Sequence, residues 1–154
     1  MTDLLKTTVQ SHPFFQGMKP EHLDILLSDA TEATFRPEQI LFREGHPANQ
    51  FYLIQSGRIA LEAHQPADGT LLIQTLGVGD VLGWSWLFQP FVWHFQARAL
   101  ETAKVIVLNG AHLLIAAEND REFGYDLMKR VVQVVVQRLQ ATRKQLLVLK
   151  PNSA

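Results

Sequence analysis

The chain has 154 residues, with 14 basic and 15 acidic side chains and a formal net charge of −1. This length suits one domain with a hydrophobic core, and the balanced charge excludes a global field that would recruit nucleic acid or an anionic membrane. The sequence contains no cysteine, which excludes disulfides, thiolate metal sites and a thiol nucleophile. No stretch resembles a signal peptide or approaches the roughly 20 apolar residues of a membrane span, so we expect a cytoplasmic protein that makes no membrane contact.

Helix signals occupy the first part of the chain, about residues 1–30. Pro20 suits the first turn of a helix, and Leu23, Leu26 and Leu27 then lie on one helical face. From about residue 33 to residue 109 the pattern changes to short apolar or alternating segments separated by turn residues. Short strands with regular turn signals favour an antiparallel β sandwich or barrel. The predicted strands include residues 40–42, 51–54, 58–63, 70–76, 95–99 and 103–108, with a hairpin turn at residues 67–69.

The last part of the chain, about residues 111–149, returns to a helical pattern. A short helix over residues 112–118 is predicted to precede a long one over about residues 123–149, which Pro151 would stop. The valine-rich stretch 131–136 favours a strand by propensity, but apolar residues recur here in alternating steps of four and three, the spacing of a helix. At 1.5 Å per residue this helix would be about 40 Å long. The apolar stripe consists of Met128, Val132, Val135, Leu139, Thr142, Leu146 and Leu149, of which only Thr142 is polar.

The long helix carries a second apolar row, and a helix that is apolar on two faces needs two partners. We therefore expect one face to pack on the chain's own domain and the other to form a homodimer; the alternative is that the apolar residues pack only on the chain's own strands. The second row consists of Leu127, Val131, Val134 and Val148. The predicted dimer interface consists of Met128, Val132, Val135, Leu139 and Leu146. The basic side chains are interpreted mainly as a solvated face: Lys129, Arg130, Arg138, Arg143 and Lys144.

Residues 84–95 contain all three tryptophans and three of the nine phenylalanines of the chain. These aromatic side chains could fill the core, could line a pocket that stacks a flat, weakly charged ligand, or could form an exposed surface for a protein partner. His94 could donate to an anion or ligate haem, or could simply be capped by a backbone carbonyl. The six histidines have no metal-binding spacing, and no nucleophile or acid–base pair stands out. We therefore expect no metal, no cofactor and no catalytic residue.

The segments FREGHPANQFYLIQSGRI (residues 42–59) and GDVLG (residues 79–83) resemble the cyclic nucleotide-binding domain superfamily, which includes the effector domains of catabolite activator and Fnr-type regulators. Gly45, Ala48 and Gly57 fall at the family's spacing, and the resemblance extends over roughly residues 13–149. It implies a β jelly roll flanked by helices, a phosphate-binding cassette, and a C-terminal helix that pairs with a second subunit. Transcription factors of the family continue into a helix-turn-helix domain. Because only residues 150–154 follow the helix here, we expect a free-standing effector domain that does not bind DNA.

The resemblance also assigns positions within the cassette. The family places a glutamate after the cassette glycine, for the ribose hydroxyl, and an arginine followed by serine or threonine further on, for the cyclic phosphate. By spacing, the glutamate position is Trp84 and the arginine–serine pair is Trp93 and His94. Burying a phosphate without charge-assisted donors costs several kcal/mol, so orthodox binding of cyclic AMP or cyclic GMP is not expected. The candidate ligand-binding residues are Gly83, Trp84, Ser85, Trp86, Leu87, Trp93, His94 and Phe95.

These observations predict a non-enzymatic regulatory or sensor module, in which a small planar ligand or a protein partner acts at the altered cassette. One alternative is a true cyclic nucleotide-binding protein whose phosphate contacts are unorthodox and come from Arg98 or from backbone amides. The other is a structural or adaptor domain whose pocket is filled by its own aromatic residues.

Overall fold

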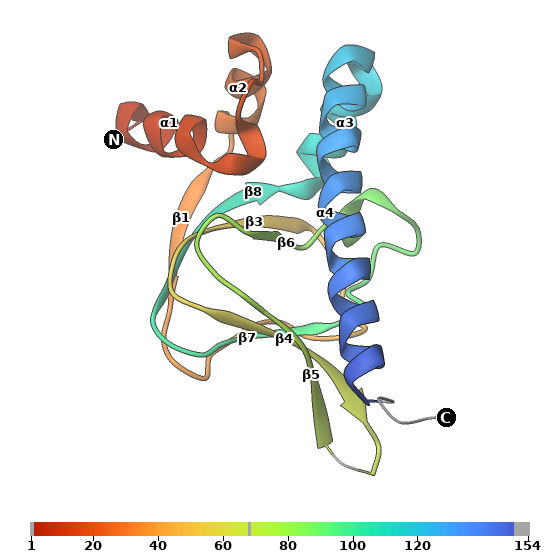
Figure 1. Cartoon of the computed structure of the whole chain (residues 1–154). Coiled ribbons are helices and arrows are strands. Elements are labelled where there is room, and N and C mark those ends of the chain that lie inside the picture. Colours follow the sequence, from red (N-terminus) through yellow and green to blue (C-terminus); the bar gives the residue numbers. More distant parts are fainter. Residues whose placement is uncertain (1, 68, 150–154) are drawn as a thin grey trace.

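The computed structural model of the chain describes residues 2–67 and 69–149, and it places a β-roll between helices from the two ends of the sequence (Figure 1). Asp68 of the predicted hairpin turn and Pro151, the predicted helix stop, lie outside the described residues. The N-terminal helices are α1 (Thr2–Ser11), the 3-10 helix η1 (Pro13–Phe15) and α2 (Pro20–Leu27), and the C-terminal helices are α3 (Gly110–Asn119) and α4 (Arg121–Leu149). The strands are β1 (Thr31–Phe35), β2 (Ile40–Phe42), β3 (Gln50–Ser56), β4 (Ile59–Gln65), β5 (Gly69–Leu76), β6 (Val81–Leu82), β7 (Gln96–Ala99) and β8 (Ala103–Asn109).

The strands form two antiparallel four-stranded sheets, in the orders β1-β8-β3-β6 and β2-β7-β4-β5. Strands that are distant in sequence are neighbours in both sheets, which is the arrangement of a jelly roll. The predicted antiparallel β jelly roll with flanking helices and a long C-terminal helix is therefore confirmed. The strand bounds agree with the predicted segments to within a few residues, because glycine and proline turns separate the strands clearly in the sequence.

Strand β3 explains why the FYLI segment contains no charged residue. Phe51 and Leu53 belong to the hydrophobic core under the helices, whereas Tyr52 and Ile54 belong to the core between the two sheets. Successive side chains of a strand point to opposite faces. A strand that is covered on both faces is therefore apolar at every position, and β3 divides the interior into these two cores.

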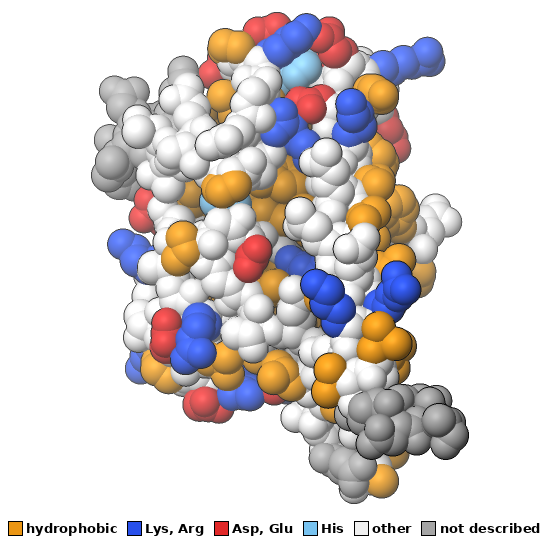
Figure 2. Space-filling view, viewed as in Figure 1, with side chains coloured by type: hydrophobic (Ala, Val, Ile, Leu, Met, Phe, Trp, Pro, Cys, Tyr) orange, Lys and Arg blue, Asp and Glu red, His pale blue; other side chains and the backbone are white. Residues whose placement is uncertain are grey.

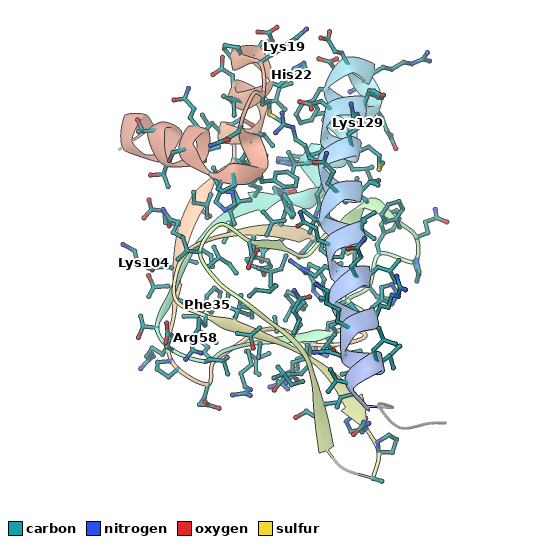
Figure 3. The ribbon with its side chains drawn as sticks, viewed as in Figure 1. Lys19, His22, Phe35, Arg58, Lys104 and Lys129 are labelled. Atoms are coloured by element: carbon teal, nitrogen blue, oxygen red, sulfur yellow. The ribbon has the colours of Figure 1, made fainter. Side chains whose placement is uncertain are left out.

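Helix α4 runs beside the β-roll, from the end where α1 and α2 lie to the hairpin of β4 and β5 (Figure 1). Phe123, Leu127 and Val131 are buried in the core under the helices, so the second apolar row packs on the chain's own domain over its first turns. Lys19 and His22 mark the end where α2 approaches α4 (Figure 3): Lys19 pairs with Glu122, and the His22 ring lies 5.4 Å from that of Phe123. Among the described residues, no helix is both long and apolar enough to cross a membrane.

The predicted dimer-interface residues of α4 face away from the β-roll, and hydrophobic side chains follow the outer edge of this helix in Figure 2. Every residue of the predicted dimer interface is exposed, from 37% for Val135 to 67% for Leu139. A row of this kind on a single copy of the chain is unsatisfied apolar surface. The alternative that all apolar residues of α4 pack on their own strands is therefore wrong, and the homodimer stays a prediction.

Candidate functional site

The residues that follow β6 line a small cavity at the edge of the core between the sheets. Phe42 and Leu61 line it from the β-roll, and Arg138 lines it from α4. The backbone of the aromatic run is held against the turn after β2, because the Trp93 N–H donates to the His46 carbonyl at 3.0 Å and the Gly45 N–H donates to the Trp93 carbonyl at 2.8 Å. The predicted ligand-binding residues that line this cassette cavity are Gly83, Trp84, Ser85, Trp93, His94 and Phe95.

Trp93 fills most of the cassette cavity with its own side chain. Its ring stacks on Phe42 with the centroids 3.9 Å apart and an interplanar angle of 18°, and it is only 4% exposed. Gly83 has a φ of +92°, and a Cβ at this position would lie 3.0 Å from the Trp93 ring, so the turn and the indole need a glycine here. The remaining space is about 50 Å³, against roughly 300–1,000 Å³ for typical small-molecule pockets. At the rim, His94 and Phe95 are exposed.

Trp86 and Leu87 do not line this cavity, although both were predicted as ligand-binding residues. They lie in the 3-10 helix η2 (Ser85–Leu87), whose turn directs Trp86 into the core under the helices. There the indole makes an edge contact with Phe51, with centroids 5.6 Å apart, and packs so closely on Gly110 that a Cβ would lie 2.5 Å from its Cγ. The structure therefore assigns Trp86 a packing role, and the aromatic run is divided between both cores.

Arg98 is directed away from the cassette cavity. It lies on β7, where Ala97 and Ala99 face the core between the sheets, so the alternation of the strand places Arg98 on the outer face. There its Nη2 donates to Glu62 Oε2 at 2.7 Å, its Nε donates to Glu62 Oε1 at 3.2 Å, and its Nη1 donates to Glu38 Oε2 at 2.7 Å. Since Glu62 is buried and needs this partner, the alternative in which Arg98 holds a cyclic phosphate is wrong.

Replacing Arg98 with methionine is expected to lower the free energy of unfolding by about 3 kcal/mol near neutral pH, because it leaves the buried Glu62 carboxylate unpaired. The hydrogen bond from Arg98 lowers the pKa of Glu62 below its ordinary value of 4.5. The pair therefore stabilises the native protein above that ordinary value, and this contribution disappears as the pH falls through the lowered pKa. Urea unfolding near neutral pH and in acid should show that the effect of R98M shrinks in acid, and that the double variant E62Q/R98M loses less than R98M. An equal loss at both pH values would contradict this assignment.

Arg138 is the residue that the sequence interpretation missed. It was placed on a solvated face, but its guanidinium lies 4.9 Å from the centroid of the Trp84 ring, and its Nη2 donates to the Val81 carbonyl. Burial lowers the pKa of Arg138 to about 10. The signal was present in the sequence, because Arg138 follows Val134 at a spacing of four and so continues the second apolar row of Leu127, Val131 and Val134. A long side chain in this row covers apolar surface with its aliphatic stem. It also brings its charge to residues 81–84, which we call the cassette turn.

The glycine-rich turn before β6 is closed by Asp80. Its Oδ2 accepts a hydrogen bond from the Gly77 N–H at 2.9 Å, which confirms the prediction that this residue caps a turn. His12 is buried beside this turn, and that burial lowers its pKa. Within the part of the chain that the structure describes, no group of three or more His, Cys, Asp or Glu side chains could hold a metal ion.

The family model of the cyclic nucleotide-binding domain matches residues 32–120. The structure of a cyclic nucleotide-binding domain from Methylobacillus flagellatus superimposes with a TM-score of 0.83, at 18% identity, over 97% of this chain and 86% of that chain.

Two curated proteins are also similar in sequence. Acetyltransferase Pat of Mycolicibacterium smegmatis is 31% identical over 83 residues, which are 54% of this chain and 25% of that protein. The CRP-like cAMP-activated global transcriptional regulator of Mycobacterium tuberculosis is 23% identical over 132 residues, which are 86% of this chain and 57% of that protein. The chain thus spans little more than half the length of one of these relatives and a quarter of the other.

Proposed function

The chain belongs to the cyclic nucleotide-binding domain family, and we propose that it acts as a non-enzymatic regulatory module that does not bind cyclic AMP or cyclic GMP in the family's orthodox way. The observation that carries this proposal is the stacking of Trp93 on Phe42, which leaves about 50 Å³ in the cassette cavity. A cyclic nucleotide would have to displace a buried indole, and Arg138 is the single arginine or lysine among the residues that line the cavity.

The contact of Arg138 with the cassette turn supports a coupling between the cassette cavity and helix α4. Arg138 is on α4, and it touches both the Val81 carbonyl and the Trp84 ring. A ligand or partner that moves the cassette turn must therefore change the contacts that hold α4 against the β-roll. Because α4 also carries the exposed apolar stripe, such a change would alter how two copies of the chain pair, and a partner protein would read the altered dimer.

The burial of Trp93 also favours a second candidate, a structural or adaptor domain that responds to no small molecule. The two candidates differ in whether the cassette can open. In the sensor, a flat ligand takes the place of the Trp93 ring on Phe42, whereas in the adaptor this stack is permanent.

Titration of the protein with cyclic AMP and cyclic GMP, followed by tryptophan emission, tests the proposal. All three tryptophans lie in the cassette segment, so binding there must change the emission. We expect no saturable change below about 1 mM, the concentration that corresponds to roughly 4 kcal/mol of binding free energy. Saturation at micromolar concentration would overturn the proposal and establish cyclic nucleotide binding with unorthodox contacts. A saturable response to another flat metabolite would favour the sensor, and an unresponsive, blue-shifted emission across the set would favour the adaptor.

A further inference from the structure

A second cavity lies beside the cassette cavity, between α4, η1, β5 and the turn that Asp80 closes. Its volume is about 280 Å³, against about 50 Å³ for the cassette cavity. Among the described residues, the two cavities share only Arg138 in their linings. Figure 2 shows the face on which α4 meets the β-roll, and the surface is hollowed along the boundary between this helix and the β-roll. This helix-side cavity is therefore distinct from the cassette cavity and large enough for a small metabolite.

The walls of the helix-side cavity are mostly polar. Amide side chains come from β5, from α4 and from Gln16 after η1, and two guanidinium groups come from α4. One carboxylate, that of Asp80, lines the cavity from the turn before β6. Amide groups can donate and accept hydrogen bonds, and guanidinium groups only donate. Such a set suits a ligand that is anionic and also carries hydroxyl or amide groups. The residues concerned are Gln74, Gln133, Gln137, Arg130 and Arg138.

The two arginines differ in how their charges are balanced. Arg130 donates to Asp126 Oδ1 at 2.9 Å and to the carbonyl of Phe14 at 2.6 Å, so its charge is paired. Arg138 belongs to none of the ion pairs formed by the described side chains, and its single hydrogen-bond acceptor there is the Val81 carbonyl. A half-buried guanidinium with five donors, one neutral acceptor and no carboxylate in direct contact keeps donor capacity for an anion. Asp80 attracts Arg138 from a longer distance, and its Oδ2 is engaged by the Gly77 N–H.

We propose that the helix-side cavity binds a small metabolite that carries a carboxylate or a phosphate group, with its charge held by Arg138 and its other polar groups bonded to the glutamines. This site goes beyond the proposed function, because it lies outside the cassette cavity, although residues 79–81 of the GDVLG segment form part of its wall. Its occupant would compete with the Val81 carbonyl for the donors of Arg138 and would disturb the contact of Arg138 with Trp84. Binding at this site would therefore reach the cassette turn without a ligand inside the cassette.

The test is a titration of the whole chain with citrate and, separately, with inorganic phosphate, at constant ionic strength set with sodium chloride. We expect a saturable change in tryptophan emission with at least one of the two, and the responsive anion identifies the carboxylate or the phosphate class. In R138Q the dissociation constant should rise about tenfold or more, because a hydrogen bond to a charged group is lost. In Q137E, which adds a carboxylate to the cavity wall and leaves Arg138 in place, the response should be lost. The Trp84→Phe variant should lose most of the emission change and keep the affinity measured by calorimetry.

The matched controls are Arg143→Gln and Gln140→Glu, which change the same kinds of side chain at exposed positions of α4 outside the cavity. Both should keep the affinity of the unmodified chain. The proposal is overturned if neither anion gives saturation in emission or calorimetry, or if the controls weaken binding as much as R138Q and Q137E do. Gln137 lines the helix-side cavity and not the cassette cavity. A response to a cyclic nucleotide that Q137E abolishes therefore belongs to the helix-side cavity, and one that Q137E keeps belongs to the cassette, so the two proposals fail separately.

Discussion

Replacing Trp93 with alanine is expected to lower the free energy of unfolding by about 3–5 kcal/mol, the range for removal of a large aromatic side chain from a packed core. The indole is buried, stacks on Phe42 and touches the backbone at Gly83, so several contacts are lost together. Urea unfolding at neutral pH measures this loss. The space that the indole leaves is apolar, and such cavities accept apolar ligands of matching shape. Added indole should therefore raise the unfolding midpoint of W93A and leave that of the unmodified chain unchanged.

Phe95→Ala is the matched control for W93A, because Phe95 lines the same cavity but is 37% exposed at its rim. Its removal should cost about 1 kcal/mol or less, as for most exposed positions. If W93A were as mild as F95A, or if indole stabilised both proteins equally, Trp93 would not be the side chain that fills the cassette. The proposal that the cassette excludes cyclic nucleotides would then lose its main support.

The fold could be predicted from the sequence because its signals are local. Pro20 begins α2, as the preference of proline for the first helical turn indicates. The FYLI segment became the central strand β3, and the steps of four and three became α4 in spite of the valine-rich stretch 131–136. In each case the pattern of a single segment was sufficient, since the spacing of its apolar residues indicates whether one face or two faces of the element are buried.

The site could be predicted only in part, because it depends on contacts between distant segments. Spacing along the chain placed Trp93 in the cassette, and the structure confirms that it lines the cavity there. Spacing could not show that η2 turns Trp86 into the other core, because both tryptophans belong to one aromatic run. It also suggested Arg98 as a nearby cation, whereas strand alternation directs Arg98 outward and α4 supplies Arg138 from forty residues further on. Whether each of these residues lines the cassette cavity depends on the direction of its side chain and not on its proximity in sequence.

If the chain is the dimer that we propose, replacing Val135 and Leu139 with glutamate together is expected to convert it into a monomer of 17.4 kDa. Both side chains lie on the exposed stripe of α4, at 37% and 67% exposure, and in a homodimer each would face its counterpart across the two-fold axis. The variant places four like charges in an apolar seam, where each would be desolvated without a partner. Light scattering coupled to size exclusion measures the mass directly, and circular dichroism should show that the helical content is kept, because neither residue belongs to either hydrophobic core.

The control for V135E/L139E is Gln140→Glu combined with Gln145→Glu, which adds the same two charges to exposed positions of the same helix outside the stripe. This control should remain dimeric. If V135E/L139E kept the dimer mass, the stripe would not be the interface, and the exposed apolar row of α4 would need another partner. If both variants became monomeric, charge on α4 as a whole would govern association. Only loss of the dimer in V135E/L139E alone supports a seam formed by the stripe. Such a seam would allow Arg138, on the adjoining face of the same helix, to connect the cassette to the pairing of two subunits, as we propose.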